Sequence, residues 1–187
     1  RSSMRAMVAE NSYDWEGDEP LSLPVENAII YELHVGGFTR HATSGVDNPG
    51  TFSGLIEKIP YLLDLGITHV ELMPIMAFDV QDVPPKTASL GLANYWGYST
   101  VGFFAPKAGY AATGKSKDGT MVADELKTLV KELHRNGMEV LPWFEMGFAT
   151  SYSQNGGHIL QKFPAWALHD TGGDLVVKNG FDWMSAV

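Results

Sequence analysis

The chain has 187 residues, of which 44% are hydrophobic and 19% charged, a balance typical of a globular protein with one core. Its formal net charge of −9 disfavours binding to nucleic acid or to anionic membrane surfaces, so a neutral ligand is expected. The sequence contains no cysteine, which excludes disulfide bonds and thiolate zinc sites, and its composition predicts a soluble protein.

The chain opens with a polar segment that precedes the first regular element. Residues 11–25 combine turn-forming residues, acids and two prolines, and we expect an extended linker there. Residues 28–35 (AIIYELHV) are apolar and rich in strand-forming residues, so they are predicted to form a buried strand. The glycine-rich, polar residues 36–50 are expected to form a loop.

Two helices and two more strands are predicted further along the chain. The first helix ends at Gly66, and the strand over 67–73 that follows it ends before Pro74. The second helix ends at Gly137 and leads into a strand over 138–144. The apolar residues at helical spacing are Leu55, Ile56, Ile59, Leu62 and Leu63 in the first helix and Leu126, Leu129, Val130 and Leu133 in the second.

Residues 74–120 form a connection far longer than the usual two to six residues between a strand and a helix. Within it, residues 94–106 (NYWGYSTVGFFAP) hold five aromatic residues that follow neither the helical nor the strand period. We therefore predict a loop, and long loops of this kind usually carry function.

Strands that alternate with helices predict a parallel sheet, either doubly wound or closed into a (β/α)8 barrel. Neither a dinucleotide fingerprint nor a P-loop occurs, so nucleotide binding has no support. Each long loop leaves the carboxyl end of a strand, which is the active face of a barrel. We predict an α/β fold, the N-terminal part of a (β/α)8 TIM barrel with about three βα units, incomplete as given. Missing strands or a partner chain would cover the open sheet edges.

Four segments in register resemble one known family, the α-amylase superfamily (glycoside hydrolase family 13), and most closely its isoamylase-type starch and glycogen debranching branch. The resemblance covers about residues 13–137. The four segments are SYDWEGDEPL (12–21), IIYELHVGGFTRH (29–41), GTFSGLIEKIPYLLDLGITHVELMPI (50–75) and NYWGYSTVGFFAP (94–106).

The resemblance implies a domain division and a function. Residues 1–27 would be the linker that follows an absent N-terminal β-sandwich, and 28–187 a partial glycoside hydrolase barrel. The implied substrate is α-glucan, cleaved at the α-1,6 branch points of glycogen or starch. No cofactor is expected, and no metal site is evident, because the carboxylates of the acidic loop do not have the spacing of a calcium loop. The implied location is the cytoplasm, or a plastid if the protein comes from a plant.

The aromatic segment is the strongest candidate binding site. A sugar ring presents a face of C–H groups that packs on aromatic rings. In the family that the chain resembles, the tyrosine at Tyr98 is expected to stack on the glucose unit at the cleavage point, with Tyr95 and Trp96 beside it. The alternative is that Tyr95, Trp96 and Phe103 only pack the loop onto the barrel rim.

Several charged residues favour structural roles over functional ones. Glu32 and His34 end the first strand, and we expect a satisfied buried pair. Asp79 and Asp82 are expected to cap turns. The last turn of the second helix contains His134–Arg135, where positive charge favours the helix dipole and needs no function.

The resemblance also implies where catalysis resides. Retaining hydrolysis needs two carboxyl groups about 5–5.5 Å apart, and in this family they follow the fourth and fifth strands, beyond Val187. The chain alone is therefore predicted to be inactive. At the third strand the family has an aspartate, an asparagine and a histidine where this sequence has Trp143, Gly147 and Phe148.

Residues 133–187 resemble a second group, glycoside-hydrolase-like barrels related to family 10, which suggests a fusion of two barrel families. In that interpretation Glu145 is a weak catalytic candidate at the end of a strand, with Trp143 beside it as a binding residue. The alternative for Glu145 is a hydrogen bond to loop backbone. A non-catalytic glucan-binding or regulatory subunit, or a structural part of a larger protein, also stays open.

Overall fold

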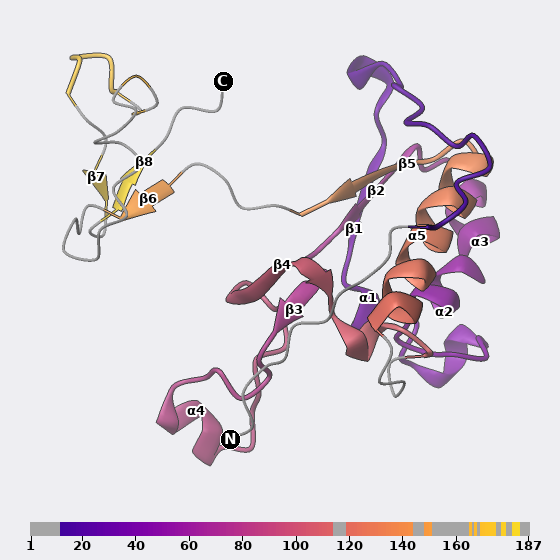
Figure 1. Ribbon diagram of the computed structural model, residues 1–187, viewed down its shortest axis with the longest axis horizontal. Coiled ribbons are helices and arrows are strands. Elements are labelled where there is room, and N and C mark those ends of the chain that lie inside the picture. Colours follow the sequence, from indigo (N-terminus) through magenta and orange to yellow (C-terminus); the bar gives the residue numbers. More distant parts are fainter. Residues whose placement is uncertain are drawn as a thin grey trace. The chain divides into compact units, whose positions relative to one another are not determined.

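The computed structural model describes residues 12–113, 119–143, 148–150, 165, 167, 169–174, 177–178 and 181–183. Contacts divide the chain into two units, Arg1–Trp143 and Phe144–Val187, which are described separately. The first unit contains the predicted alternation of strands and helices (Figure 1).

The first unit is built on a parallel sheet. Strands β1 (Ile30–Leu33), β2 (His69–Leu72) and β5 (Glu139–Pro142) lie in the order β1-β2-β5 and confirm the predicted strands and the α/β class. In this register Leu33 pairs with Leu72, so the carboxyl ends of the strands lie at one edge of the sheet. The prediction that the first strand is buried is wrong for its first half, because Ile30 is 52% exposed on a strand at the edge of the described sheet.

The first predicted helix is two short helices. They are α2 (Phe52–Ile56) and α3 (Ile59–Asp64), and the break falls just before Pro60. Proline has no N–H, so Pro60 cannot donate the helical hydrogen bond to the carbonyl of Ile56 four residues earlier, where α2 ends. Thr51 caps α2 by accepting a hydrogen bond from the Gly54 N–H.

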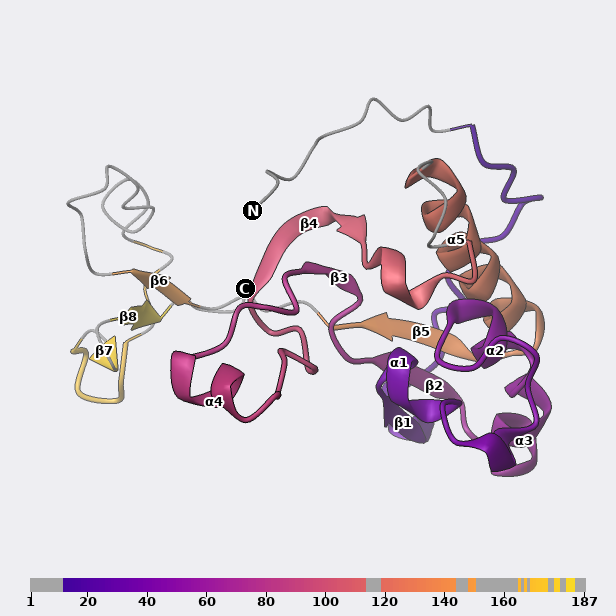
Figure 2. The ribbon, with the colours of Figure 1, turned by 90° about the horizontal axis from the view of Figure 1, so that it is seen from below.

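The second predicted helix is a single long element. Helix α5 (Gly119–Arg135) ends before Gly137, whose φ of +75° is the left-handed conformation that glycine adopts readily. Helices α2, α3 and α5 all cover the same side of the sheet (Figure 1 and Figure 2). The buried core formed between them and the strands includes Leu33, Phe52, Leu55, Leu62, Val70, Leu72, Leu129, Leu133 and Met138.

The long connection after β2 was predicted to be a loop, but it also contains regular elements. It contains β3 (Met76–Phe78) and β4 (Thr100–Pro106), which pair antiparallel, and the short helices α4 (Pro85–Ser89) and η3 (Ala108–Tyr110). Phe103 and Phe104 therefore lie on a strand. The alternation is hidden in the sequence because β4 is mostly exposed on both faces and its register with β3 is irregular.

Residues 13–22, which we call the N-terminal segment, run along α5 before η1 (Val25–Asn27). The predicted linker is thus irregular, as expected, but it is bound to the helix. The Tyr13 hydroxyl lies 3.1 Å from Thr128 Oγ1, and the Asp18 carboxylate lies 2.8 Å from His134 Nδ1. His134 is buried and has a structural role that the dipole argument did not reveal.

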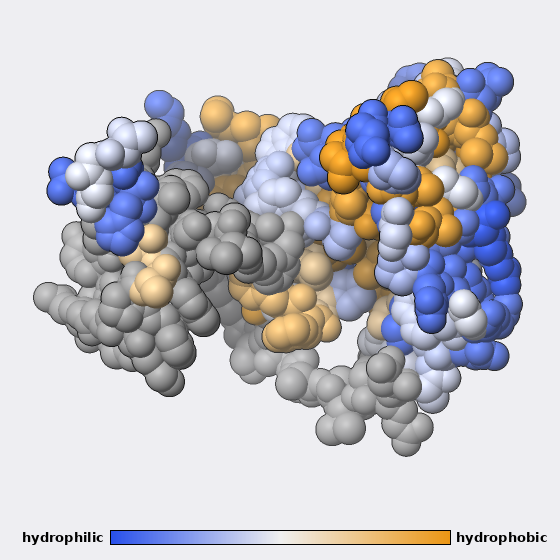
Figure 3. Space-filling view, turned by 90° about the horizontal axis from the view of Figure 1, so that it is seen from above, coloured by the Kyte–Doolittle hydropathy of each residue, from blue (hydrophilic) through white to orange (hydrophobic). Residues whose placement is uncertain are grey.

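Hydrophobic residues also lie on the surface of the first unit, as the space-filling view shows (Figure 3). Val25, Ile29 and Ile30, around the start of β1, are all more than half exposed. On the described residues of the chain, no helix is long and apolar enough to cross a membrane.

The second unit contains a small antiparallel sheet. Its strands β6 (Phe148–Thr150), β7 (Val177–Lys178) and β8 (Phe181–Trp183) lie in the order β6-β8-β7. Phe148, one of the residues that departs from the family pattern, starts β6.

Candidate functional site

The carboxyl edge of the parallel sheet carries the aromatic residues predicted from the sequence. His34 follows β1 and Trp143 follows β5, and the Trp143 N–H donates to the Leu72 carbonyl at 2.8 Å. Tyr98 lies against Trp143, with ring centroids 4.9 Å apart and ring planes at 86°. Two predicted binding residues 45 positions apart therefore meet at one place. We call Tyr95, Trp96, Tyr98 and Trp143 the aromatic cluster.

The rings of the aromatic cluster are accessible. Tyr95, Trp96 and Tyr98 are 47%, 53% and 46% exposed, and Trp143 is half-buried. Tyr95 and Trp96 meet edge to face with centroids 5.1 Å apart. Half-exposed aromatic rings anchored on one side can present a free face to a ligand.

A tight turn fixes the loop of the aromatic cluster. Gly97 has φ of +80°, and a Cβ there would lie 2.6 Å from the Phe78 ring, so this position requires glycine. The Asn94 side chain accepts from the Gly97 N–H at 3.2 Å and donates to Ser99 Oγ at 3.0 Å. These contacts explain the glycine and the asparagine of the NYWGYS stretch.

His34 is buried beneath this loop. Its Nε2 lies 2.9 Å from the Tyr95 carbonyl oxygen and 2.9 Å from the Tyr110 hydroxyl. Burial, and to a lesser degree Arg40, lower the pKa of His34. Burial also raises the pKa of Tyr110 to about 12.

The prediction that Glu32 and His34 form a buried pair is wrong. Glu32 is exposed, whereas His34 turns into the interior because the chain leaves β1 and enters α1 (Val35–Phe38) directly after it. The role of Tyr110 was missed, since a single tyrosine in AGYAAT, a stretch of mainly alanine and glycine, gives no signal in the sequence.

The other residues singled out from the sequence lie outside the aromatic cluster or outside the described residues. Asp79 caps a turn, as predicted, by accepting from the Gln81 N–H at 2.9 Å, and the Asp82 N–H donates to the Asp79 carbonyl at 3.2 Å. Glu145 and Gly147 lie outside the described residues. Within the described ranges, no group of three or more His, Cys, Asp or Glu side chains could hold a metal ion.

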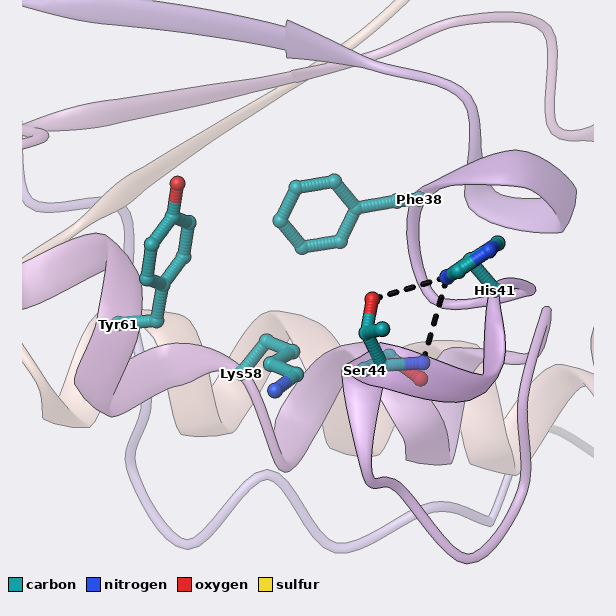
Figure 4. Close-up of a pocket in the computed structure, with 6 residues that line it drawn as sticks. Phe38, His41, Ser44, Lys58 and Tyr61 are labelled. Atoms are coloured by element: carbon teal, nitrogen blue, oxygen red, sulfur yellow. Dashed lines mark hydrogen bonds between the residues drawn. The ribbon is translucent and has the colours of Figure 1, made fainter.

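A shallow pocket of about 200 Å³ lies on another part of the first unit (Figure 4). The Phe38 ring lies between Tyr61 and His41, with Lys58 beneath (Figure 4). His41 Nδ1 accepts from the Thr43 N–H at 3.3 Å, so it orders the short helix η2 (Ala42–Ser44). No residue of the aromatic cluster lines this pocket.

Known proteins resemble the chain over most of its length, although no family model matches it. Isoamylase 1 (chloroplastic) of Arabidopsis thaliana is 44% identical over 134 residues, which is 71% of this chain and 17% of that protein. The glycogen operon protein GlgX homolog of Mycobacterium tuberculosis (strain H37Rv) is 38% identical over 160 residues, covering 84% of this chain and 21% of that protein. The chain thus spans about a fifth of the length of these relatives.

Solved structures of pullulanases also resemble the chain. A pullulanase from Paenibacillus barengoltzii in complex with maltohexaose and α-cyclodextrin has a TM-score of 0.58 and 26% identity, covering 90% of this chain and 28% of that one. Type I pullulanase from Bacillus subtilis complexed with maltose has a TM-score of 0.58 and 27% identity, covering 97% of this chain and 25% of that one.

These similarities, together with the parallel sheet and the aromatic residues at its carboxyl edge, relate the chain to glycoside hydrolases. The chain belongs to family 13, the α-amylase superfamily, and the relatives named above are an isoamylase and a glycogen operon protein. The GlgX match covers 84% of the chain and so extends past residue 137, where the predicted resemblance ended. The second resemblance, over residues 133–187, stays a prediction.

Proposed function

We propose that the chain is the first part of the (β/α)8 barrel of an α-glucan debranching enzyme that acts on α-1,6 bonds of glycogen or starch. Residues 28–187 would belong to the barrel, and residues 1–27 would link it to a preceding β-sandwich. The order β1-β2-β5, with helices between parallel strands, supports a barrel start. The β1 and β5 edges would then pair with the remaining strands of the barrel.

The observation that carries this proposal is the contact between Tyr98 and Trp143 at the carboxyl edge of the sheet. Active sites of barrels lie at this edge. Two perpendicular rings form a corner, and a glucose unit can pack its C–H face on one ring while the other ring flanks it. The pullulanase structures that resemble the chain hold maltohexaose or maltose, which are α-glucans of the proposed class.

The described residues supply binding surface, and the catalytic pair would come from the rest of the barrel. Retaining cleavage needs a nucleophile and a general acid about 5–5.5 Å apart. The carboxyl ends of β1 and β5 lead into His34 and Trp143, neither of which is a carboxylic acid. Residues 1–187 alone should therefore bind α-glucan without hydrolysing it.

Calorimetric titration with maltohexaose tests the binding proposal. This linear α-1,4 glucan has no branch point, so the full gene product should bind it and leave it intact. Tyr98→Ala and Trp143→Ala should each weaken binding about tenfold, since an aromatic contact contributes on the order of 1 kcal/mol beyond its buried area. Phe104→Ala is the matched control, because this phenylalanine is fully exposed on β4. Equal affinities for all four proteins would refute the proposed site.

A second candidate is a non-catalytic glucan-binding or regulatory subunit. The observation that favours it is Trp143, which stands where the family resemblance implies an aspartate that braces the catalytic site. Such a subunit would bind maltohexaose through the aromatic cluster but would release no reducing ends from amylopectin. Measured release by the full gene product would exclude this candidate.

A further inference from the structure

His34 connects the sheet to the loop of the aromatic cluster. It is 9% exposed at the carboxyl end of β1, and its backbone carbonyl accepts hydrogen bonds from the N–H groups of Gly37 and Phe38, both at 2.9 Å. The backbone of His34 is therefore fixed by the strand on one side and by the start of α1 on the other. The position of its Cα and Cβ atoms is therefore well defined.

The imidazole of His34 holds two consecutive residues of the aromatic cluster. Its Nε2 lies 2.9 Å from the Tyr95 carbonyl oxygen, and its ring stacks on the Tyr95 ring with centroids 4.2 Å apart and planes at 18°. The Trp96 ring lies nearly perpendicular to the imidazole, with centroids 5.7 Å apart and planes at 85°. A hydrogen bond and a stacking contact from one side chain fix both the backbone and the ring of Tyr95.

Two glycines make room for this arrangement. A Cβ on Gly36 would lie 2.9 Å from Tyr110 Cε1 and 3.0 Å from His34 Cε1. A Cβ on Gly37 would collide with the Tyr95 hydroxyl and lie 3.4 Å from His34 Nδ1. Neither glycine has a positive φ, so both are needed for space rather than for backbone conformation.

The hydrogen bonds select one form of the imidazole. With its proton on Nε2, neutral His34 donates to the Tyr95 carbonyl and the Tyr110 hydroxyl oxygen, which lie at the same distance, and leaves only a lone pair on buried Nδ1, which has no partner. A proton on Nδ1 would instead be a buried donor without an acceptor, which costs more. The charged or polar groups facing the ring are Arg40, Tyr95 and Tyr110, and none of them is a carboxylate.

We propose that His34 is a positioning residue, which holds the loop carrying Tyr95, Trp96 and Tyr98 in its glucan-binding conformation. This inference rests on the proposed function for its ligand, but the positioning itself is independent of any ligand. His34 does not need to touch the sugar. It acts through the Tyr95 backbone and ring.

Hydrogen exchange tests the positioning without a ligand. In the full gene product, His34→Phe keeps a ring that can stack on Tyr95 but removes the Nε2 contact, and His34→Gln keeps an amide N–H near the position of Nε2. Exchange over residues 94–99 should become about 5- to 10-fold faster in His34→Phe, the effect of losing one hydrogen bond. It should return most of the way to the wild-type rate in His34→Gln. Unchanged exchange in His34→Phe would overturn the proposal.

His41→Phe is the matched control, since His41 is an exposed histidine of the neighbouring loop that is hydrogen-bonded only locally, to Thr43. It should leave exchange over residues 94–99 unchanged. Exchange over 69–72 in β2 should be the same in all variants, which shows that the fold is retained.

Maltohexaose titration of the same variants gives the ligand readout. His34→Phe should bind about 5- to 10-fold more weakly than wild type, with His34→Gln in between. Faster exchange with unchanged affinity would overturn the link between positioning and glucan binding. If wild type itself does not bind maltohexaose, the proposed function fails, and the exchange rates still decide whether His34 positions the loop.

Discussion

Glu139 shows at the scale of one residue how the sheet, helix α5 and the N-terminal segment are joined. Its carboxylate accepts hydrogen bonds from the N–H groups of Leu21 at 2.9 Å and Ser22 at 3.2 Å, and it lies 3.0 Å from His134 Nε2. Since Asp18 lies at the other nitrogen of the same imidazole, His134 bridges two carboxylates.

The lowered pKa of Glu139 predicts that the folded protein loses stability in acid. Burial acts to raise this pKa, but hydrogen bonds from the Val140 N–H, His134 and the Ser22 N–H outweigh it, so the folded-state pKa lies below the ordinary value of 4.5. A depressed carboxyl pKa contributes stability that is present above the unfolded-state pKa and is lost as pH falls through the folded-state pKa. The free energy of unfolding should therefore decrease below about pH 4.5.

Urea denaturation over a pH series measures this effect. Glu139→Gln should flatten the acid limb of the profile. The exposed neighbour Glu19, changed to Gln, is the control and should leave the profile as in wild type. An unchanged acid limb in Glu139→Gln would contradict the assignment.

Gly97 allows a second test at the residue scale. Gly97→Ala combines a left-handed backbone with a collision against the Phe78 ring, whereas Gly91→Ala has a similar φ of +72° with open space around the new Cβ. Gly91→Ala should cost about 1–2 kcal/mol of unfolding free energy, and Gly97→Ala about 1–3 kcal/mol more. Equal destabilisation in urea would mean that the Phe78 contact does not constrain the turn.

At the scale of elements, local patterns predicted most of what was found and long-range contacts set the rest. Helix α5 and strands β2 and β5 follow from periodicity and from the glycines that end helices, because these signals lie within a few residues of one another. The break before Pro60 could have been predicted from proline chemistry. Strand β4 could not, since its partner β3 is short and the pairing is irregular.

At the candidate site, the residues could be selected from the sequence, but their pairing could not be predicted. Tyr95, Trp96, Tyr98 and Trp143 were selected by residue type and family resemblance. Their pairing needs the register of β5 against β2, which no local pattern contains. His34 was assigned to the wrong partner because its true contacts come from the loop 61 residues away and from Tyr110, 76 residues away.

The attachment of the N-terminal segment to α5 can be tested with a substitution at Asp18. Asp18→Asn should weaken its attachment to α5, because His134 loses a charged acceptor that is only 12% exposed, at a cost of about 1–3 kcal/mol. Limited proteolysis should then cleave within residues 13–22 faster than in wild type. Glu26→Gln, an exposed change in η1, is the control. Cleavage at the wild-type rate in Asp18→Asn would show that the segment is held by its other contacts.

At the scale of the whole molecule, the described sheet is open on two sides. Strands β1 and β5 each pair with β2 only, within the part of the chain that the structure describes. Hydrophobic side chains lie exposed near the β1 edge at Val25, Ile29 and Ile30. The barrel that we propose would account for both features, because its further strands and helices would cover this surface.

The central claim is that this chain contributes the glucan-binding side of a debranching barrel. The most direct test is the release of reducing ends from amylopectin by the full gene product and by its Tyr98→Ala variant, with Phe104→Ala as control. We expect release by wild type and by the control, and release by Tyr98→Ala that is about 10- to 100-fold slower, which corresponds to the loss of about 1.4–2.7 kcal/mol of stacking in the transition state. No release by wild type, or equal rates for wild type and Tyr98→Ala, would contradict the account.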